Sequence, residues 1–204
     1  MRLILVRHGQ TGSNVTRALD TAEPGADLTD LGREQAEALV ERFGEERVDL
    51  LVTSQLVRTR QTAAPLAKAL GLTPREDPRI REIVAGDLEM LNDDDSVAAY
   101  VTAIAAWMEG ALDVRMPGAE SGHEVIARYD AAVEEARSEV GDGAAMFVSH
   151  GAVIRTWAAV RGANVPPGWG IRNVLHNTDA VVLQERGGEW MVESWQGLTL
   201  DGER

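Results

Sequence analysis

The chain has 204 residues, the size of one α/β domain, of which 44% are apolar and 26% are charged. These values exclude a disordered or membrane-embedded chain. A formal net charge of -13 at pH 7 excludes a general basic surface for nucleic acid or anionic lipid. Because cysteine is absent, disulfides, thiolate metal sites and cysteine nucleophiles are excluded as well.

Short apolar runs alternate with amphipathic segments along the chain. Runs that predict strands buried on both faces cover residues 2–6, 48–53 and 145–149. Residues 179–185 and 189–195 predict two further strands, joined as a hairpin through Gly187 and Gly188.

Helices are expected between these strands. The first is capped by Thr29 or Asp30, ends before Gly44, and carries apolar residues at helical spacing (Ala36, Leu39, Val40 and Phe43). Further helices are predicted over residues 55–70, 96–109, 122–140 and 152–161.

This alternation predicts an α/β fold in which right-handed crossovers build a mainly parallel sheet with helices on both faces. We expect a three-layer α/β/α sandwich with an antiparallel edge strand. The chain is expected to form a single domain over residues 1–204, with a lid-like segment at about 83–121.

Two histidines follow two of the predicted buried strands in the same way. His8 and His150 each come after an apolar strand and one polar residue, and each precedes a glycine, Gly9 or Gly151. Ligands of parallel sheets bind at the carboxyl ends of strands. If these two strands are neighbours, both imidazoles can reach one small group, and the glycines let the backbone approach it closely.

Two arginines add positive charge near the same edge. Arg7 precedes His8, and Arg58 lies in the first turns of the helix after the second strand. A guanidinium binds phosphate oxygens with two parallel donors, and a helix N-terminus favours anions as well. The four side chains therefore predict a local phosphate pocket in a strongly acidic protein.

The chain resembles the histidine phosphatase superfamily, which has the phosphoglycerate-mutase-like fold. Six blocks in family order carry the resemblance: Leu5-Val6-Arg7-His8-Gly9-Gln10-Thr11 with Asn14, Leu28–Ala36, Thr53–Arg58 with Gln61-Thr62-Ala63, Ile80-Arg81-Glu82 with Gly86, Pro117–Ser121, and Ser149-His150-Gly151. Together they span roughly residues 1 to 157.

The resemblance implies that His8 attacks phosphorus and forms a phosphohistidine, which requires a neutral imidazole. It implies that Arg7, Arg58 and His150 bind the phosphate oxygens through the transition state. Positions that match the family's substrate contacts are Thr11, Asn14, Gly9, Ser121 and Gly151.

The leaving alkoxide needs a proton, and the phosphohistidine then needs an activated water; one carboxyl group can serve in both steps. In one branch of the family this acid follows the second histidine, but here Gly151 stands there. Glu82 occupies the other branch's position and is therefore expected to be the acid/base. Asp87 and Glu89 are alternatives, and a surface ion pair with Arg79 or Arg81 is the structural alternative for Glu82.

These features predict a phosphomonoester hydrolase; a phosphoglycerate-mutase-type phosphotransferase and an inactive phosphate-binding module remain alternatives. Leu88, Met90 and Leu91 stand where related phosphatases have an aromatic residue and a glycine, so the pocket wall is altered. Residues 83–149 hold three basic and fourteen acidic residues. This excess of acidic residues favours a neutral or cationic leaving group.

Neither a cofactor nor a metal is expected. The partner predicted for the chain is a small-molecule phosphomonoester, without nucleic acid or membrane, and a homodimer through the C-terminal hairpin is an open alternative. The apolar run after Met1 is too short for a signal peptide, and no segment approaches the ~20 apolar residues of a membrane span, so a cytoplasmic protein is expected. His123 and His176 are expected to be structural, although His123 is close enough to Ser121 to line the pocket.

Overall fold

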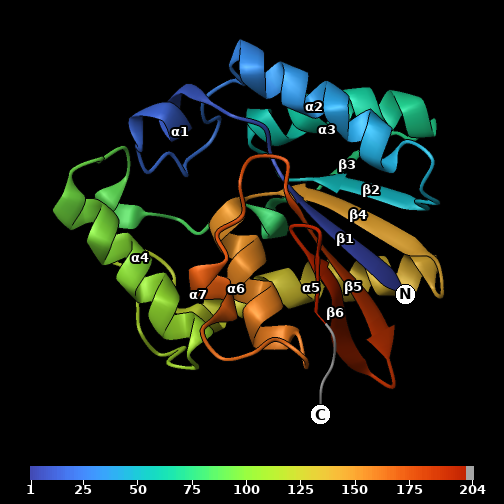
Figure 1. Ribbon diagram of the computed structural model, residues 1–204. Coiled ribbons are helices and arrows are strands. Elements are labelled where there is room, and N and C mark those ends of the chain that lie inside the picture. The colour runs from blue at the N-terminus through green and yellow to red at the C-terminus, as the bar shows by residue number, and fades with distance from the viewer. Residues whose placement is uncertain (201–204) are drawn as a thin grey trace.

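A computed structural model describes residues 1–200 as a seven-stranded sheet between two layers of helices (Figure 1). The strands are β1 (Arg2–Arg7), β2 (Leu50–Thr53), β3 (Arg75–Glu76), β4 (Ala144–Ser149), β5 (Ala180–Arg186), β6 (Glu189–Trp195) and β7 (Leu198–Thr199). Their order across the sheet is β3-β2-β4-β1-β5-β6-β7. The three-layer α/β/α architecture is confirmed.

Seven α-helices and two 3₁₀ turns connect the strands within the described residues. The helices are α1 (Gly12–Thr16), α2 (Asp30–Phe43), α3 (Val57–Leu70), α4 (Asp94–Met108), α5 (Gly122–Val140), α6 (Gly151–Arg161) and α7 (Trp169–Arg172). The 3₁₀ turn η1 (Pro78–Ile80) precedes the segment predicted as a lid, and the 3₁₀ turn η2 (Gly86–Leu88) lies within that segment together with α4.

The sheet is parallel on one side and antiparallel on the other. Strands β3, β2, β4 and β1 pair in parallel, whereas β5 pairs antiparallel with β1 and begins the predicted hairpin with β6. Gly187 and Gly188 form its turn with φ of 62° and 85°, which L-residues with side chains rarely adopt. The antiparallel side therefore holds the predicted hairpin of β5 and β6, and the short β7, which was not predicted, pairs with β6 at its edge.

Alternate side chains of the central strands pack into two separate hydrophobic cores, one on each face of the sheet. In β1, Leu3 and Leu5 face the core formed with α4, α5 and α6, while Ile4 and Val6 face the one formed with α2 and α3. Figure 1 shows α2 and α3 on one face of the sheet and α5 and α6 on the other. Burial on both faces explains why the strand sequences are continuously apolar.

Capping side chains set several helix boundaries. Asp93 accepts a hydrogen bond from the Ser96 backbone N–H, so the acidic run at 93–95 begins α4 two residues earlier than predicted. Helix α5 has the predicted bounds, and a reciprocal cap joins Ser121 and Glu124 at its start. Helix α3 begins at Val57 instead of residue 55, because the Leu56 N–H bonds the Ser54 hydroxyl in a turn before the helix.

The loop after β1 packs directly on the start of α2. A Cβ atom added to Gly32 would lie 2.1 Å from the Gln10 carbonyl oxygen, and one added to Gly9 would lie 2.5 Å from the Gly32 carbonyl oxygen. Neither contact can be relieved by a side-chain rotation, since the atoms met belong to the backbone. Glycines at these positions therefore set the close approach of α2 to the segment that follows His8.

Replacing Gly32 with alanine should lower the free energy of unfolding by about 1–3 kcal/mol, because the backbone of Gln10 must move. Urea unfolding of Gly32→Ala and of the control Gly12→Ala measures this effect. Gly12 lies in α1, and an added Cβ there meets nothing within 4 Å. Equal stability changes in the two variants would contradict the close-packing explanation.

Candidate active site

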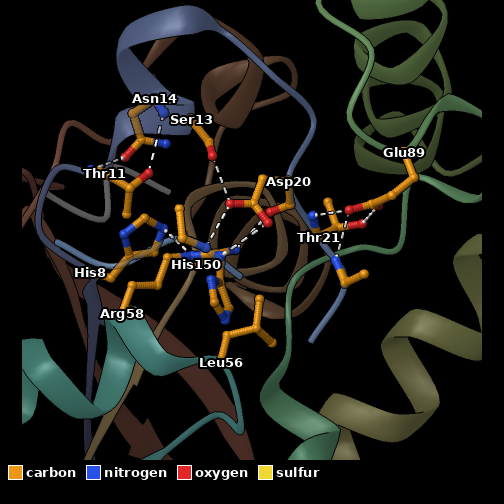
Figure 2. A network of polar contacts seen from close by, with 12 residues as sticks. His8, Thr11, Ser13, Asn14, Asp20, Thr21, Leu56, Arg58, Glu89 and His150 are labelled. Carbon is orange, nitrogen blue, oxygen red and sulfur yellow. Dashed lines mark hydrogen bonds and ion pairs between the residues drawn. The ribbon is translucent and has the colours of Figure 1, made fainter. Parts of the chain in front are cut away.

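The two histidines lie side by side at the carboxyl ends of neighbouring strands. In the parallel pairing of β1 with β4, Arg7 is opposite Ser149, and the His8 N–H donates to the Ser149 carbonyl at 3.0 Å. The ring centroids of His8 and His150 are 5.2 Å apart. The predicted adjacency of the two imidazoles is therefore present, and Figure 2 shows them within one polar network.

The hydrogen bonds of His8 fix its tautomer. Its Nδ1 lies 2.7 Å from the Gly9 carbonyl, which can only accept, so Nδ1 carries the proton. Its Nε2 accepts from Arg58 Nε at 3.1 Å. Burial, together with the charges of Arg58 and Arg7, holds the pKa of His8 well below its usual 6.5. The imidazole is thus neutral, with a lone pair on Nε2.

His150 is completely buried, and its pKa is also well below 6.5, mainly because of burial and then the charge of Arg58. Its Nε2 lies 2.7 Å from the Ser54 hydroxyl, which follows β2. Ser54 also accepts from the Leu56 N–H, so the turn before α3 holds this imidazole in place. The His150 Nδ1 atom is buried and has no hydrogen-bond partner within residues 1–200.

Arg58 is almost entirely buried and is held from two sides. Its Nε donates to His8, and its Nη2 donates to the Asp20 carbonyl at 2.9 Å. The Asp20 carboxylate lies 3.8 Å from Arg58 Nη1 and is itself held by the Ser13 hydroxyl and the Ala26 N–H (Figure 2). The loop after α1 therefore positions Arg58 on the reactive side of His8.

Three nitrogen atoms of this cluster are buried without a hydrogen-bond partner among the described residues: Arg7 Nε, Arg58 Nη1 and His150 Nδ1. Arg7 is otherwise anchored through Nη1, which donates to the Leu175 carbonyl at 2.6 Å. Burial lowers the pKa of both arginines, yet guanidinium groups remain charged at neutral pH. Unsatisfied buried donors are costly, so this arrangement fits a small oxyanion.

Glu82 lies beside the cluster and caps helix α6. Its Oε1 accepts the N–H groups of Ile83 and Val153, both at 2.9 Å, and its Oε2 accepts the N–H of Ala152 at 3.1 Å. Neither Arg79 nor Arg81 pairs with it; these two bind Asp77 and Glu120 instead. Oε1 therefore accepts two N–H groups and Oε2 accepts one.

A cavity of about 200 Å³ opens over this cluster. The predicted site residues that line it are Arg7, His8, Asn14, Arg58, Glu82 and Gly151, while the buried His150 lies behind the wall. Gly9, Thr11 and Ser121 are not on the wall: Gly9 donates to Thr62, Thr11 caps α1, and Ser121 caps α5. The Ser121-x-x-Glu124 pattern is a capping signal already visible in the sequence.

The other histidines and carboxylates stand apart. His123 is exposed and pairs with Asp113, and His176 is exposed and pairs with Asp179. Glu89 holds the backbone N–H groups of Thr21 and Ala22, and it does not line the cavity.

Several cavity residues had no motif in the sequence. Asp20, Tyr100 and Arg155 all line the wall. The Tyr100 hydroxyl donates to the Ile83 carbonyl at 2.8 Å, which ties α4 to the residue after Glu82. Tyr100 faces inward on α4 at the spacing of the buried residues Ala103, Ile104 and Trp107, so only helical periodicity could have indicated its burial.

The acidic residues between positions 83 and 149 lie away from the cavity. Of that stretch, only Tyr100 is on the wall. The charged residues that do line the cavity are Arg7, Arg58, Arg155, Asp20 and Glu82. The expectation of a neutral or cationic leaving group rested on the acidic excess in this stretch, and the structure removes that basis.

Within residues 1–200, no group of three or more His, Asp or Glu side chains is arranged to hold a metal ion. None of the helices in that range has the length and apolar character needed to cross a membrane.

The chain is similar to known proteins over most of its length. The model of the histidine phosphatase superfamily (branch 1) matches residues 3–197. A probable phosphoglycerate mutase GpmB of Escherichia coli O1:K1 / APEC is 30% identical over 96% of this chain and 90% of its own length. The PE-PGRS family protein PE_PGRS11 of Mycobacterium tuberculosis is 32% identical over 95% of this chain, which spans 36% of that protein.

Solved structures show the same likeness. A mycobacterial glucosyl-3-phosphoglycerate phosphatase, solved with VO3, has a TM-score of 0.82 and 30% identity, covering 97% of this chain and 99% of its own.

The low pKa of His8 has a measurable consequence for stability. Unfolding releases a histidine of ordinary pKa, which takes up a proton, so the free energy of unfolding falls as pH drops below about 6.5. The contribution of one such histidine is at most about 1.4 kcal/mol per pH unit. Urea unfolding at pH 7.5, 6.5 and 5.5 should show a shallower pH dependence for His8→Gln than for wild type. The exposed His123→Gln is the control, and identical slopes for wild type and His8→Gln would contradict a buried neutral His8.

Proposed function

This chain belongs to branch 1 of the histidine phosphatase superfamily, and on that premise we propose that it hydrolyses a phosphomonoester through a phosphohistidine on His8. The reaction needs no metal in this proposal. The observation that carries it is the prepared state of His8, whose Nδ1 proton is held by Gly9 while Nε2 keeps its lone pair. An imidazole held in this way can attack phosphorus at neutral pH.

Binding of the phosphoryl group begins with Arg58. In the free protein its Nε–H occupies the lone pair of His8 Nε2, so a substrate must draw this donor onto its own oxygens. The unpartnered nitrogens of Arg7 and Arg58, both on the cavity wall, then supply donors for the remaining oxygens. Such prearranged donors stabilise the charge that the transition state carries on these oxygens.

Transfer to His8 forms the Nε2–P bond while the bond between phosphorus and the ester oxygen breaks. The leaving oxygen takes a proton from Glu82 Oε2, which releases the neutral alcohol. In the second step Glu82, now ionised, accepts a proton from water as the water oxygen attacks phosphorus and the P–Nε2 bond breaks. Inorganic phosphate leaves, and both His8 and Glu82 return to their starting protonation states.

The names of the relatives support two reaction outcomes. The mycobacterial neighbour is named a phosphatase and the Escherichia coli relative a probable mutase. A cavity of about 200 Å³ is below the ~300 Å³ of the smallest usual ligand pockets, which favours a small monoester over the doubly phosphorylated species that a mutase must hold. We therefore place hydrolysis first and isomerisation second.

Release of inorganic phosphate from a panel of alkyl and aryl monoesters, with EDTA present, tests the proposal. His8→Ala should lose turnover entirely, since no other imidazole on the wall can form the phosphoenzyme. The control His123→Ala removes an exposed histidine and should retain wild-type rates. Turnover that survives in His8→Ala, or that vanishes with EDTA, would overturn the mechanism. Formation of 2-phosphoglycerate from 3-phosphoglycerate in place of free phosphate would establish the mutase instead.

The role of Glu82 predicts a dependence on the leaving group. Glu82→Gln keeps one oxygen that can accept an N–H group of α6 and replaces the other with an NH2 group, which removes the acid. This change should lower kcat for alkyl esters by roughly 100- to 10,000-fold. Aryl esters release a stable phenolate that needs less protonation, so the rate of their first step should fall much less. A burst of phenolate measures this rate. If the rate of the first step falls equally for alkyl and aryl esters, another group transfers the proton.

A further inference from the structure

The backbone that carries Glu82 is held by side chains from three other elements. The chain between η1 and η2 is irregular, so no helical or strand pairing fixes it there. Side-chain donors bind five consecutive carbonyl groups instead, those of residues 79–83. The donors are Ser149 at the end of β4, Tyr100 on α4 and Arg128 on α5. The position of this segment therefore depends on elements that lie far away in sequence.

Arg128 makes contact with three of these five carbonyl groups. Its Nη1 donates to the carbonyls of Arg79 and Arg81 at 2.6 and 2.9 Å, and its Nη2 donates to the carbonyl of Glu82 at 3.1 Å. The side chain is only 10% exposed, and its Nε and Nη2 also donate to the Glu120 carboxylate at 2.8 and 3.2 Å. Because a guanidinium is planar and rigid, its acceptors are held in one fixed arrangement.

Arg128 holds Glu82 through its backbone and not through its carboxyl group. That carboxyl group accepts the N–H of Ile83 and two N–H groups of α6, and within residues 1–200 it forms no ion pair. A guanidinium in direct contact with a carboxylate favours the ionised form. Arg128 is paired with Glu120 instead, so the anchor on the Glu82 backbone leaves the carboxyl group able to lose and regain a proton.

We propose that Arg128 is a positioning residue for the acid/base, which acts by fixing the backbone of Glu82 and makes no contact with the substrate. This inference rests on the role of Glu82 proposed above. Arg128 is not among the residues that line the cavity, so its effect on the reaction passes through Glu82. A catalytic group displaced by about 1 Å can lose roughly 100-fold in rate. Loss of this anchor should therefore impair protonation of the leaving oxygen and spare the attack by His8.

The test uses Arg128→Lys, which keeps a positive charge for Glu120 but loses the planar group that reaches three carbonyls. This variant should lower kcat for alkyl monoesters roughly 10- to 100-fold. The first step with aryl monoesters, measured as the burst of phenolate, should slow much less, because phenolate needs less protonation. The matched control is Arg161→Lys, in which the arginine binds Asp130 outside the cavity; both rates should remain those of wild type.

A double variant separates positioning of the acid from general damage to the fold. In Glu82→Gln no acid is left to position, so the addition of Arg128→Lys should change the alkyl rate by less than about twofold. A purely structural arginine would slow both classes of ester alike, and by the same factor with and without the Glu82 carboxyl group. Either of these results, or an alkyl rate unchanged in Arg128→Lys, would overturn the proposal.

A crystal structure of Arg128→Lys gives a measurement independent of turnover. Glu82 should be displaced by roughly 1 Å, with loss of the hydrogen bond from the Ala152 N–H to Oε2. An unmoved Glu82 would contradict the proposal. Selective loss of the alkyl rate in Glu82→Gln but not in Arg128→Lys would overturn only the role of Arg128. If Glu82→Gln slows alkyl and aryl esters equally, the acid/base assignment proposed above fails, and the role of Arg128 fails with it.

Discussion

The parallel pairing of β1 with β4 is the constraint on which the site depends. Its register brings the ends of both strands to one edge, so the residues that follow, His8 and His150, need no long loops to meet. Strands buried on both faces cannot slip by one residue without exchanging the two cores. The same packing that stabilises the sheet therefore sets the distance between the imidazoles.

A cationic cavity in a protein of net charge -13 is possible because charge is arranged locally. The acidic residues of α4 and α5 lie on outer surfaces or pair with arginines there, while the wall of the cavity carries three arginines and two carboxylates. One carboxylate, Asp20, holds Arg58, and the other, Glu82, is bound by backbone N–H groups. Global charge consequently says little about the ligand of a buried site.

Much of the fold and the centre of the site could be predicted because their signals are local. Apolar runs, the glycines after His8 and His150, and the Thr29 cap of α2 each depend on a few neighbouring residues. The wall of the cavity could not be predicted in this way. Arg155 and Tyr100 reach it only because α6, α7 and α4 pack together, and Asp20 because a loop folds over Arg58. The short β3 and β7 gave no signal because each has two residues.

The carboxyl group of Glu82 has two roles, as the proposed acid/base and as the cap of helix α6. His150 occupies the N-cap position of α6 but makes no capping bond, and Glu82, 70 residues away in sequence, supplies the missing acceptor. Each cycle of the proposed reaction thus alters the charge that the first turn of α6 relies on. A related protein without catalytic activity would still need Glu82, because its carboxylate caps α6. Its retention in a sequence is therefore weaker proof of activity than its position suggests.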